Sequence, residues 1–116
     1  MPLVRLETTE KLPPDKKAAL CAELSKLCAE LIGKPEEYMM AIVADGLSIL
    51  RSGEPGPAAF VDVRSIGGLG PKVNRALAER ICGLLERALG IPGGRVYLNM
   101  LDVAARDWGH DGTTYG

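Results

Sequence analysis

Several features that commonly indicate a function are missing from this chain. Its 116 residues carry a net charge of −1 with both signs interspersed, so no basic stripe or acidic tail indicates nucleic acid or a strongly charged partner. No apolar run approaches the length of a membrane span, and the first residues lack the long apolar stretch of a signal peptide. We therefore expect a soluble cytoplasmic protein, with one domain and one core.

Cysteine is scarce and poorly placed for disulfides or metal. The three cysteines form no CxxC motif, and Cys21 and Cys28 are two helical turns apart, about 10 Å along a helix axis. That separation is too long for a disulfide. Because His110 is the single histidine, a zinc site is not expected either. We predict reduced, buried thiols and no metal.

What the chain does contain is an internal repeat with an offset of 57 residues. Proline, glycine and apolar positions recur in the same order in both halves, which indicates a duplicated unit. The matched pairs are Leu3 with Phe60, Val4 with Val61, Leu6 with Val63, Pro14 with Pro71, Leu20 with Leu77, Leu24 with Ile81, Leu27 with Leu84, Cys28 with Leu85, Gly33 with Gly90, and Pro35 with Pro92.

Each unit is predicted to fold as strand, helix, strand. Helical spacing of apolar residues follows Pro14 and Pro71, which suit first helical positions, and ends at the capping glycines Gly33 and Gly90. Short apolar or alternating runs predict four strands, at Leu3–Glu7, Tyr38–Ala44, Ala59–Ser65 and Val96–Val103.

The predicted fold class is α+β. A strand–helix–strand unit of this length makes a right-handed parallel crossover, so two units give a four-stranded sheet with both helices on one face. Residues 1–116 then form one domain, with repeats at roughly 2–46 and 59–103. From element order alone, a ferredoxin-like binding domain is the alternative fold.

The run from Tyr38 to Ala44 is apolar at almost every position, so both faces of that strand require burial. Two helices cover only one face of the sheet. Another copy of the chain is the simplest cover for the other face, and a homo-oligomer is therefore predicted.

Pro2 is the most informative single residue. Proline after the initiator methionine permits removal of Met1, which leaves a secondary amine at the terminus. If burial and a nearby cation lower its pKa, such an amine is neutral and basic near pH 7. Alone, Pro2 is a weak signal, because proline is common at this position.

Taken together, motifs along the whole length give the chain a resemblance to the macrophage migration inhibitory factor family of the tautomerase superfamily. These motifs are Met1-Pro2, Gly33-Lys34-Pro35-x-x-Tyr38, Ser65-Ile66-Gly67, Cys82-Gly83, Arg95-Val96-Tyr97-x-Asn99, Asp102, and the tail from Trp108 to Tyr115. The resemblance implies a homotrimer with active sites at subunit interfaces. It also implies interconversion of keto and enol forms of α-keto acids such as phenylpyruvate, or of dopachrome-like compounds, without metal or organic cofactor.

The resemblance also implies roles for five residues. Pro2 is the base that moves the proton, and Lys34 lies near the substrate carboxylate or carbonyl, where its charge also helps to keep the Pro2 amine neutral. Ile66 lines the site through its backbone. Tyr97 and Asn99 enter the pocket from the neighbouring subunit. Each of three residues also has a purely structural alternative: Lys34 as a solvated lysine at a helix end, Tyr97 as an ordinary strand tyrosine, and Asn99 as a subunit contact.

The tail and the third strand depart from the family pattern. His110 occupies the place of the usual tail tryptophan, while Trp108 precedes it by two residues and Tyr115 replaces a terminal phenylalanine. We expect Trp108 and Tyr115 to line the pocket, with a changed mouth. Arg64 stands where some animal members carry histidine. A pocket-facing Arg64 could bind a carboxylate, but a surface or interface role is the favoured prediction. The CxxC of some members is absent at residues 58–61, so thiol oxidoreduction is not carried over.

Two alternatives remain open from the sequence. One is a cytokine-like interaction protein with a vestigial pocket, which could act outside the cell by a route that needs no signal peptide. The other is hydration or dehalogenation of an unsaturated acid, for which Arg64 and Arg75 are candidate ligands.

Residues 67–70 have only a superficial likeness to a phosphate loop. The Walker and dinucleotide spacings are missing, so a flexible turn between a strand and a helix is predicted.

Overall fold

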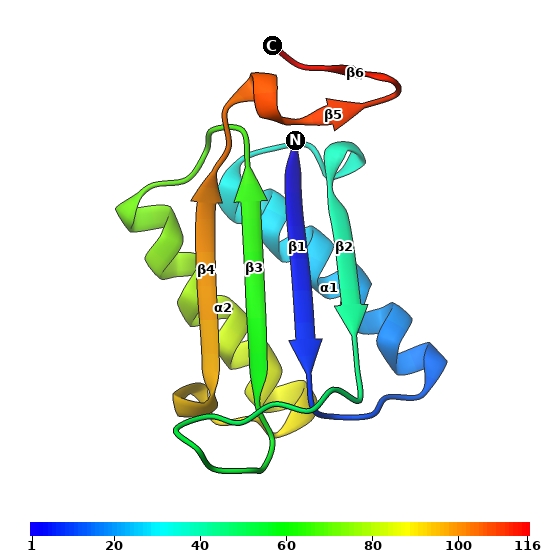
Figure 1. Cartoon of the computed structure of the whole chain (residues 1–116), viewed down its shortest axis with the longest axis vertical. Coiled ribbons are helices and arrows are strands. Elements are labelled where there is room, and N and C mark those ends of the chain that lie inside the picture. Colours follow the sequence, from blue (N-terminus) through cyan, green and yellow to red (C-terminus); the bar gives the residue numbers. More distant parts are fainter.

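The computed structural model describes all residues, 1–116, as two long helices on a four-stranded sheet, followed by a short hairpin tail (Figure 1). The elements are β1 (Pro2–Thr8), α1 (Pro14–Ile32), the 3₁₀ turn η1 (Glu36–Tyr38), β2 (Met40–Ala44), β3 (Ala59–Ser65), α2 (Pro71–Leu89), η2 (Gly93–Arg95), β4 (Val96–Asp102), η3 (Ala105–Asp107), β5 (Gly109–His110) and β6 (Thr113–Thr114). This architecture confirms the predicted fold class and the duplicated βαβ units.

The sheet has the strand order β2-β1-β3-β4. β1 pairs with β2 in parallel and β3 with β4 in parallel, while β1 and β3 run antiparallel at the centre. Each parallel pair is therefore adjacent, with no strand inserted between its members. A split βαβ arrangement is excluded, and with it the ferredoxin-like alternative.

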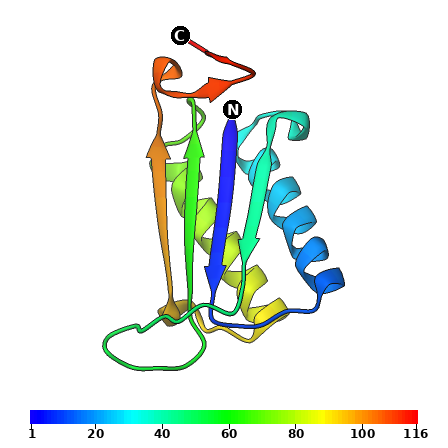
Figure 2. The ribbon, with the colours of Figure 1, turned by 45° about the vertical axis from the view of Figure 1, so that its right-hand side comes forward.

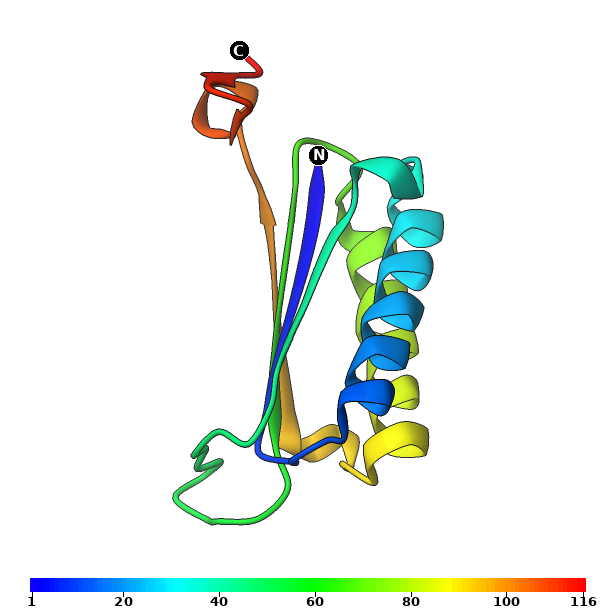
Figure 3. The same cartoon turned by 90° about the vertical axis from the view of Figure 1, so that its right-hand side faces the viewer.

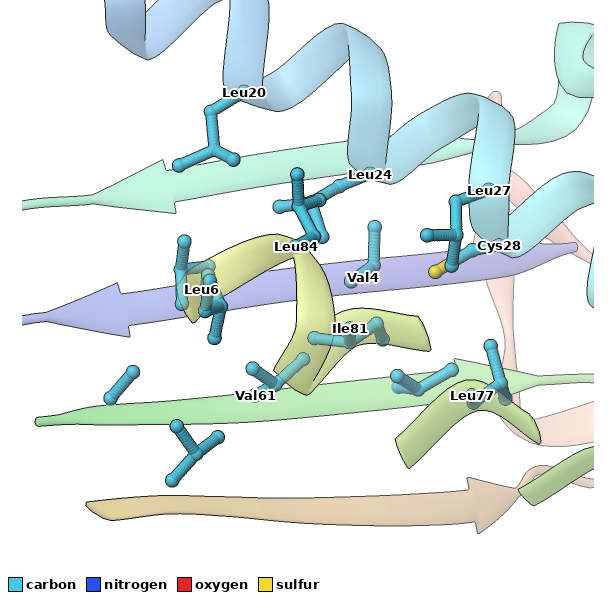
Figure 4. Packing of buried hydrophobic residues seen from close by; sticks show 14 of the residues in the cluster. Val4, Leu6, Leu20, Leu24, Leu27, Cys28, Val61, Leu77, Ile81 and Leu84 are labelled. Atoms are coloured by element: carbon cyan, nitrogen blue, oxygen red, sulfur yellow. The ribbon is translucent and has the colours of Figure 1, made fainter. Parts of the chain in front are cut away.

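Both helices cover the same face of the sheet (Figures 2 and 3). Along β1 and β3 every second residue is buried, because alternate side chains point toward the helices. The core is one cluster of buried side chains from both helices and from β1, β3 and β4 (Figure 4), and Ala41 and Val43 of β2 pack against it. Its largest fully buried members include Leu6, Leu24, Leu77, Ile81 and Leu85.

The helix boundaries follow from local chemistry. Pro14 and Pro71 occupy the first turns, where a missing N–H costs no hydrogen bond. Gly33 and Gly90 end the helices in the left-handed conformation, with φ of 79° and 69°. The amides of Gly33 and Gly90 donate back to the last turns, which satisfies carbonyls that the helix leaves free.

β2 is shorter than predicted. Tyr38 belongs to the 3₁₀ turn that follows Pro35, and the strand begins only at Met40. The face of the sheet away from the helices is open in the single chain, and large apolar side chains lie exposed there, with Met40 61%, Tyr97 60% and Leu101 46% accessible. Neither helix is apolar enough over its length to cross a membrane.

Candidate functional site

A cleft of about 690 Å³ lies at the N-terminal end of β1. It is bounded by the start of β1, the turn into β2, one residue of β3 and the C-terminal tail, whose strand β5 passes over the N-terminus (Figure 1). The lining residues are Met1, Pro2, Leu3, Glu37, Tyr38, Met39, Met40, Arg64, Val103, Asp107, Trp108, Gly109, His110 and Tyr115. Three of the predicted site residues are among them: Pro2, Trp108 and Tyr115.

Pro2 is the first residue of β1 and is fully buried at the base of this cleft. It lies opposite Ser65 of β3 in the antiparallel ladder, so its position is fixed by the sheet. Directly after Ser65, the backbone N–H of Ile66 donates to the carbonyl oxygen of Met1 at 3.3 Å. Ile66 thus approaches the N-terminus through its backbone, and its side chain does not line the cleft.

Lys34 follows the capping glycine of α1 and is half-buried. Its side chain runs beside the loop after β3. A Cβ added to Gly67 would lie 4.0 Å from Lys34 Nζ, and a Cβ added to Gly68 would lie 3.5 Å from Lys34 Cε. No carboxylate lies within ion-pairing distance of its ammonium group. Burial lowers the pKa of the Met1 amine, and the charge of Lys34 lowers it further. The cation therefore acts on the chain terminus without lining the cleft.

The loop between β3 and α2 is held by side chains from the ends of β3 and β4. The N–H of Gly67 donates to Asp102 Oδ1 at 2.9 Å, and the Ser65 hydroxyl donates to the Gly67 carbonyl at 2.6 Å. These bonds fix the backbone of Ile66 beside Met1. The loop is a fixed turn between a strand and a helix, and nothing in it resembles a phosphate cradle.

The tail forms the outer wall of the cleft. Trp108 is half-buried, and its carbonyl accepts a hydrogen bond from the Tyr115 N–H at 3.2 Å. The rings of His110 and Tyr115 are stacked, with centroids 6.0 Å apart and planes 6° from parallel. His110 thus joins the wall beside the two predicted residues.

Tyr97 and Asn99 lie elsewhere in the chain. In the strand register Asp102 is level with Ser65, and hence with Pro2, whereas Tyr97 is level with Phe60 at the opposite end of the sheet. Five residues of strand separate the two levels, or about 17 Å. Tyr97 lies on the exposed face of β4, where the Arg51 guanidinium is stacked on its ring, 4.4 Å from the ring centre. A single chain therefore does not bring Tyr97 to Pro2.

The cleft also contains Tyr38 and Met40, which were not among the predicted site residues and enter from the turn and from the edge strand. Arg64, for which a pocket role was one of two predictions, enters from β3. The family motif that contains Tyr38 could have placed this residue in the site. Met40 carries no such signal, because the sequence indicates only an apolar strand there. No three histidine, cysteine or acidic side chains lie close enough together to hold a metal ion.

The duplicated fold is that of the tautomerase superfamily, and it places the buried Pro2 in a cleft beside the N-terminus. The family model described as macrophage migration inhibitory factor matches residues 1–116, and the chain belongs to this family. Its relatives include the macrophage migration inhibitory factor homolog of Brugia malayi, 33% identical over the full length of both chains. Similar solved structures include the macrophage migration inhibitory factor homologue from Prochlorococcus marinus, with a TM-score of 0.93 and 38% identity, covering 98% of this chain and 99% of that chain. The macrophage migration inhibitory factor-like protein from Entamoeba histolytica has a TM-score of 0.93 and 32% identity, covering 98% of each chain.

Proposed function

We propose that this protein is a cofactor-independent keto–enol tautomerase of small α-keto acids, such as phenylpyruvate, in which Pro2 is the general base once Met1 has been removed. The observation that carries the proposal is the buried Pro2 at the base of an open cleft. The charge of Lys34, which has no carboxylate partner, acts on the amine of the preceding residue, Met1. Family membership supports an isomerase in general terms. Dopachrome-like compounds belong to the same proposal.

The reaction requires a neutral amine at the terminus. Burial and Lys34 already lower the pKa of the Met1 amine, and an amine on Pro2 would lie one residue deeper in the same surroundings. Its nitrogen would take the proton from the carbon next to the keto group, and the electron pair of that bond would move to the carbonyl oxygen. Return of the proton to this oxygen gives the enol.

Loss of Met1 would also release a hydrogen-bond donor. The Ile66 N–H now donates to the Met1 carbonyl, which disappears with that residue. A free backbone donor beside the base is suited to the developing enolate oxygen, since donors fixed before the reaction stabilise charge that forms in it. Lys34 would hold the substrate carboxylate, and Trp108 and Tyr115 would enclose the rest of the molecule.

The complete site would form in a homotrimer. Proteins of this fold are generally oligomeric, and the open sheet face of the single chain exposes Met40, Tyr97 and Leu101. A neighbouring subunit that covers this face could place its own Tyr97 and Asn99 against the cleft. We place the trimer in the cytoplasm, where thiols such as the buried Cys28 stay reduced.

Turnover of phenylpyruvate by the purified protein, followed by the absorbance of the enol, tests the proposal. A Pro2→Gly variant also permits Met1 removal but carries a primary amine with a different pKa and geometry. General-base catalysis contributes roughly 10²–10⁴-fold, so we expect kcat/KM to fall by at least about tenfold. Equal turnover by both proteins would show that Pro2 is not the base. No turnover by either would favour an interaction protein with a vestigial pocket.

A second measurement separates the two forms of the terminus. While Met1 is attached, the Pro2 nitrogen is a tertiary amide whose lone pair is delocalised into the carbonyl, so it cannot accept a proton near neutral pH. A sample shown by mass spectrometry to retain Met1 should be nearly inactive, and enzymatic trimming should restore its activity. Full activity in a uniformly Met1-blocked sample would exclude Pro2 as the base.

A further inference from the structure

Arg64 is the one lysine or arginine side chain that lines the cleft. It is the residue before Ser65 at the end of β3 and is level with Leu3, so it lies within one residue of the Pro2 position in the register. Its neighbours Val63 and Ser65 are buried toward the helices, whereas Arg64 is exposed and points to the opposite face. A positive charge therefore borders the cleft on the side of the sheet away from the helices.

Asp62 fixes the orientation of this guanidinium. The two residues are two positions apart on one strand and share a face. Arg64 Nε donates to Asp62 Oδ1 and Oδ2 at 3.3 and 3.2 Å, and Nη2 donates to Oδ2 at 3.0 Å. The Asp62 carboxylate is mostly covered, with 18% of its side chain exposed, against 48% for Arg64. Asp62, which anchors the pair, is thus the less exposed partner, and the cation of Arg64 is the more accessible one.

The pairing leaves one edge of the guanidinium free. Asp62 occupies the edge formed by Nε and Nη2, while Nη1 and the outer N–H of Nη2 have no acceptor in the structure. That remaining edge presents two parallel donors, the arrangement that binds a carboxylate in a bidentate manner. A lysine or a histidine at this position could not offer the same pair of donors.

The charges around the cleft restrict where a second anion can lie. Glu37 and Asp107 also line it and repel a carboxylate that approaches them. Lys34, at the end of α1, has its side chain near Gly67 and lowers the pKa of the amine at the chain terminus. Arg64 points to the face of the sheet away from the helices. The two cations therefore flank the start of β1, and the acids occupy other parts of the wall.

We propose that Arg64, oriented by Asp62, binds a second carboxylate of the substrate, so that the preferred substrates are 2-oxo acids that carry another carboxylate at the distal end. This inference rests on the proposed tautomerase function, in which Lys34 holds the carboxylate next to the keto group. The two cations then select dicarboxylates over otherwise identical monocarboxylates.

The test compares 2-oxo dicarboxylates of increasing chain length, beginning with oxaloacetate, with their distal methyl esters. Arg64→Met should lower kcat/KM for the preferred dicarboxylate by about ten- to a hundredfold, the effect of losing a charge-assisted hydrogen bond, and change that of its ester less than about threefold. Asp62→Asn should weaken the same discrimination in part. Arg80→Met, at an exposed position of α2, is the control and should leave kcat/KM unchanged for both the dicarboxylate and its ester. Equal effects of Arg64→Met on acid and ester throughout the series would overturn the proposal.

Binding distinguishes failure of this inference from failure of the tautomerase function. Trp108 is the only tryptophan and lines the cleft, so its fluorescence reports occupancy without turnover. If the unsubstituted protein turns over none of the substrates, the tautomerase function fails, and Kd values decide the role of Arg64. The Arg64 proposal then requires Arg64→Met to weaken binding of the dicarboxylate and not of the ester. An unchanged Kd for the dicarboxylate would overturn it.

Discussion

The ammonium group of Lys34 lies near the chain terminus with no counter-ion, although acidic residues are common in the chain. A cation kept unpaired and half-buried is available to an anionic ligand. Lys34→Ala should lower turnover of phenylpyruvate more than that of its methyl ester. Loss of a charge-assisted contact costs about 1.5–3 kcal/mol, or roughly ten- to a hundredfold. Comparison of kcat/KM for acid and ester measures this, and an equal loss for both would show that Lys34 does not hold the carboxylate.

The same substitution should change the pH profile. The terminal amine is active when neutral, so kcat/KM rises as pH increases through the pKa of the amine. For the Met1 amine, burial is the larger cause of the lowered pKa and the charge of Lys34 the smaller one. The same two causes would act on the Pro2 amine once Met1 is removed. Lys34→Ala should therefore move the rising limb to higher pH without restoring the ordinary value of the amine. Lys34→Arg keeps the charge and is the matched control, in which the limb should stay in place.

At the scale of the elements, the loop from β3 to α2 has little room for a side chain at Gly68. Gly68 has a φ of 82°, and a Cβ there would lie 2.7 Å from Ile32 Cγ2 and 2.8 Å from the Ile32 carbonyl oxygen. Gly33 has a similar φ of 79° but open space around it. Gly33→Ala should cost about 1–2 kcal/mol through the backbone alone. Gly68→Ala should cost about 1–3 kcal/mol more, because the clash includes backbone.

Chemical denaturation measures both losses as free energies of unfolding. Gly94→Ala is the control, since Gly94 lacks a positive φ and has no neighbour within 4 Å of an added Cβ. It should change stability by less than about 0.5 kcal/mol. If Gly68→Ala were no more destabilising than Gly33→Ala, the close contact between the loop and the end of α1 would be contradicted.

The helices were predictable because their signals are local. Proline at the first turn, apolar residues at helical spacing and a capping glycine all lie within the segment that they define, and they occur in both repeats. β2 was predicted two residues too early because Tyr38 and Met39 are apolar, and only the backbone after Pro35 shows a 3₁₀ turn there. Apolar character alone does not distinguish a strand from the turn that leads into it.

The candidate site was harder to predict because it combines segments that are distant in sequence. Pro2, Lys34 and Ile66 were placed by resemblance, and the sheet register with the loop after β3 explains why they meet. The tail hairpin β5–β6 was not predicted, since two-residue strands carry no periodic pattern. Arg64 had been considered for a pocket role, but only the cleft and its pairing with Asp62 give it one.

At the scale of the whole molecule, the open sheet face and the loop between β2 and β3 are the surfaces without a partner. This loop projects to the side away from the helices (Figure 3), and its Leu50 is 69% exposed. Leu50→Glu should leave the single chain folded, because the side chain is outside the core. It should oppose association, because an unpaired charge would be buried at an interface.

Light scattering measures the outcome. The unsubstituted protein should have a mass of about 37 kDa, three times the 12.3 kDa of one chain, and Leu50→Glu should move it toward the single-chain mass. Ala88→Glu adds the same charge on the exposed side of α2 and should remain a trimer. A stable monomer of the unsubstituted protein at micromolar concentration would contradict both the trimer and the shared site.

Complementation between two inactive variants tests whether one site draws on two chains. Pro2 and Tyr97 are separated by about 17 Å along the strands of one chain, so they can share a site only across an interface. Pro2→Gly should inactivate the part of each site that carries the base. A double variant, Tyr97→Ala with Asn99→Ala, should inactivate the part that the neighbouring chain supplies. When equal amounts are unfolded together and reassembled at random, about a quarter of the sites combine an intact Pro2 with an intact Tyr97. Activity should therefore return to about a quarter of that of the unsubstituted protein, whereas each variant reassembled alone stays inactive. If mixing restored nothing while mass spectrometry showed mixed trimers, Tyr97 and Asn99 would have no part in the neighbouring site.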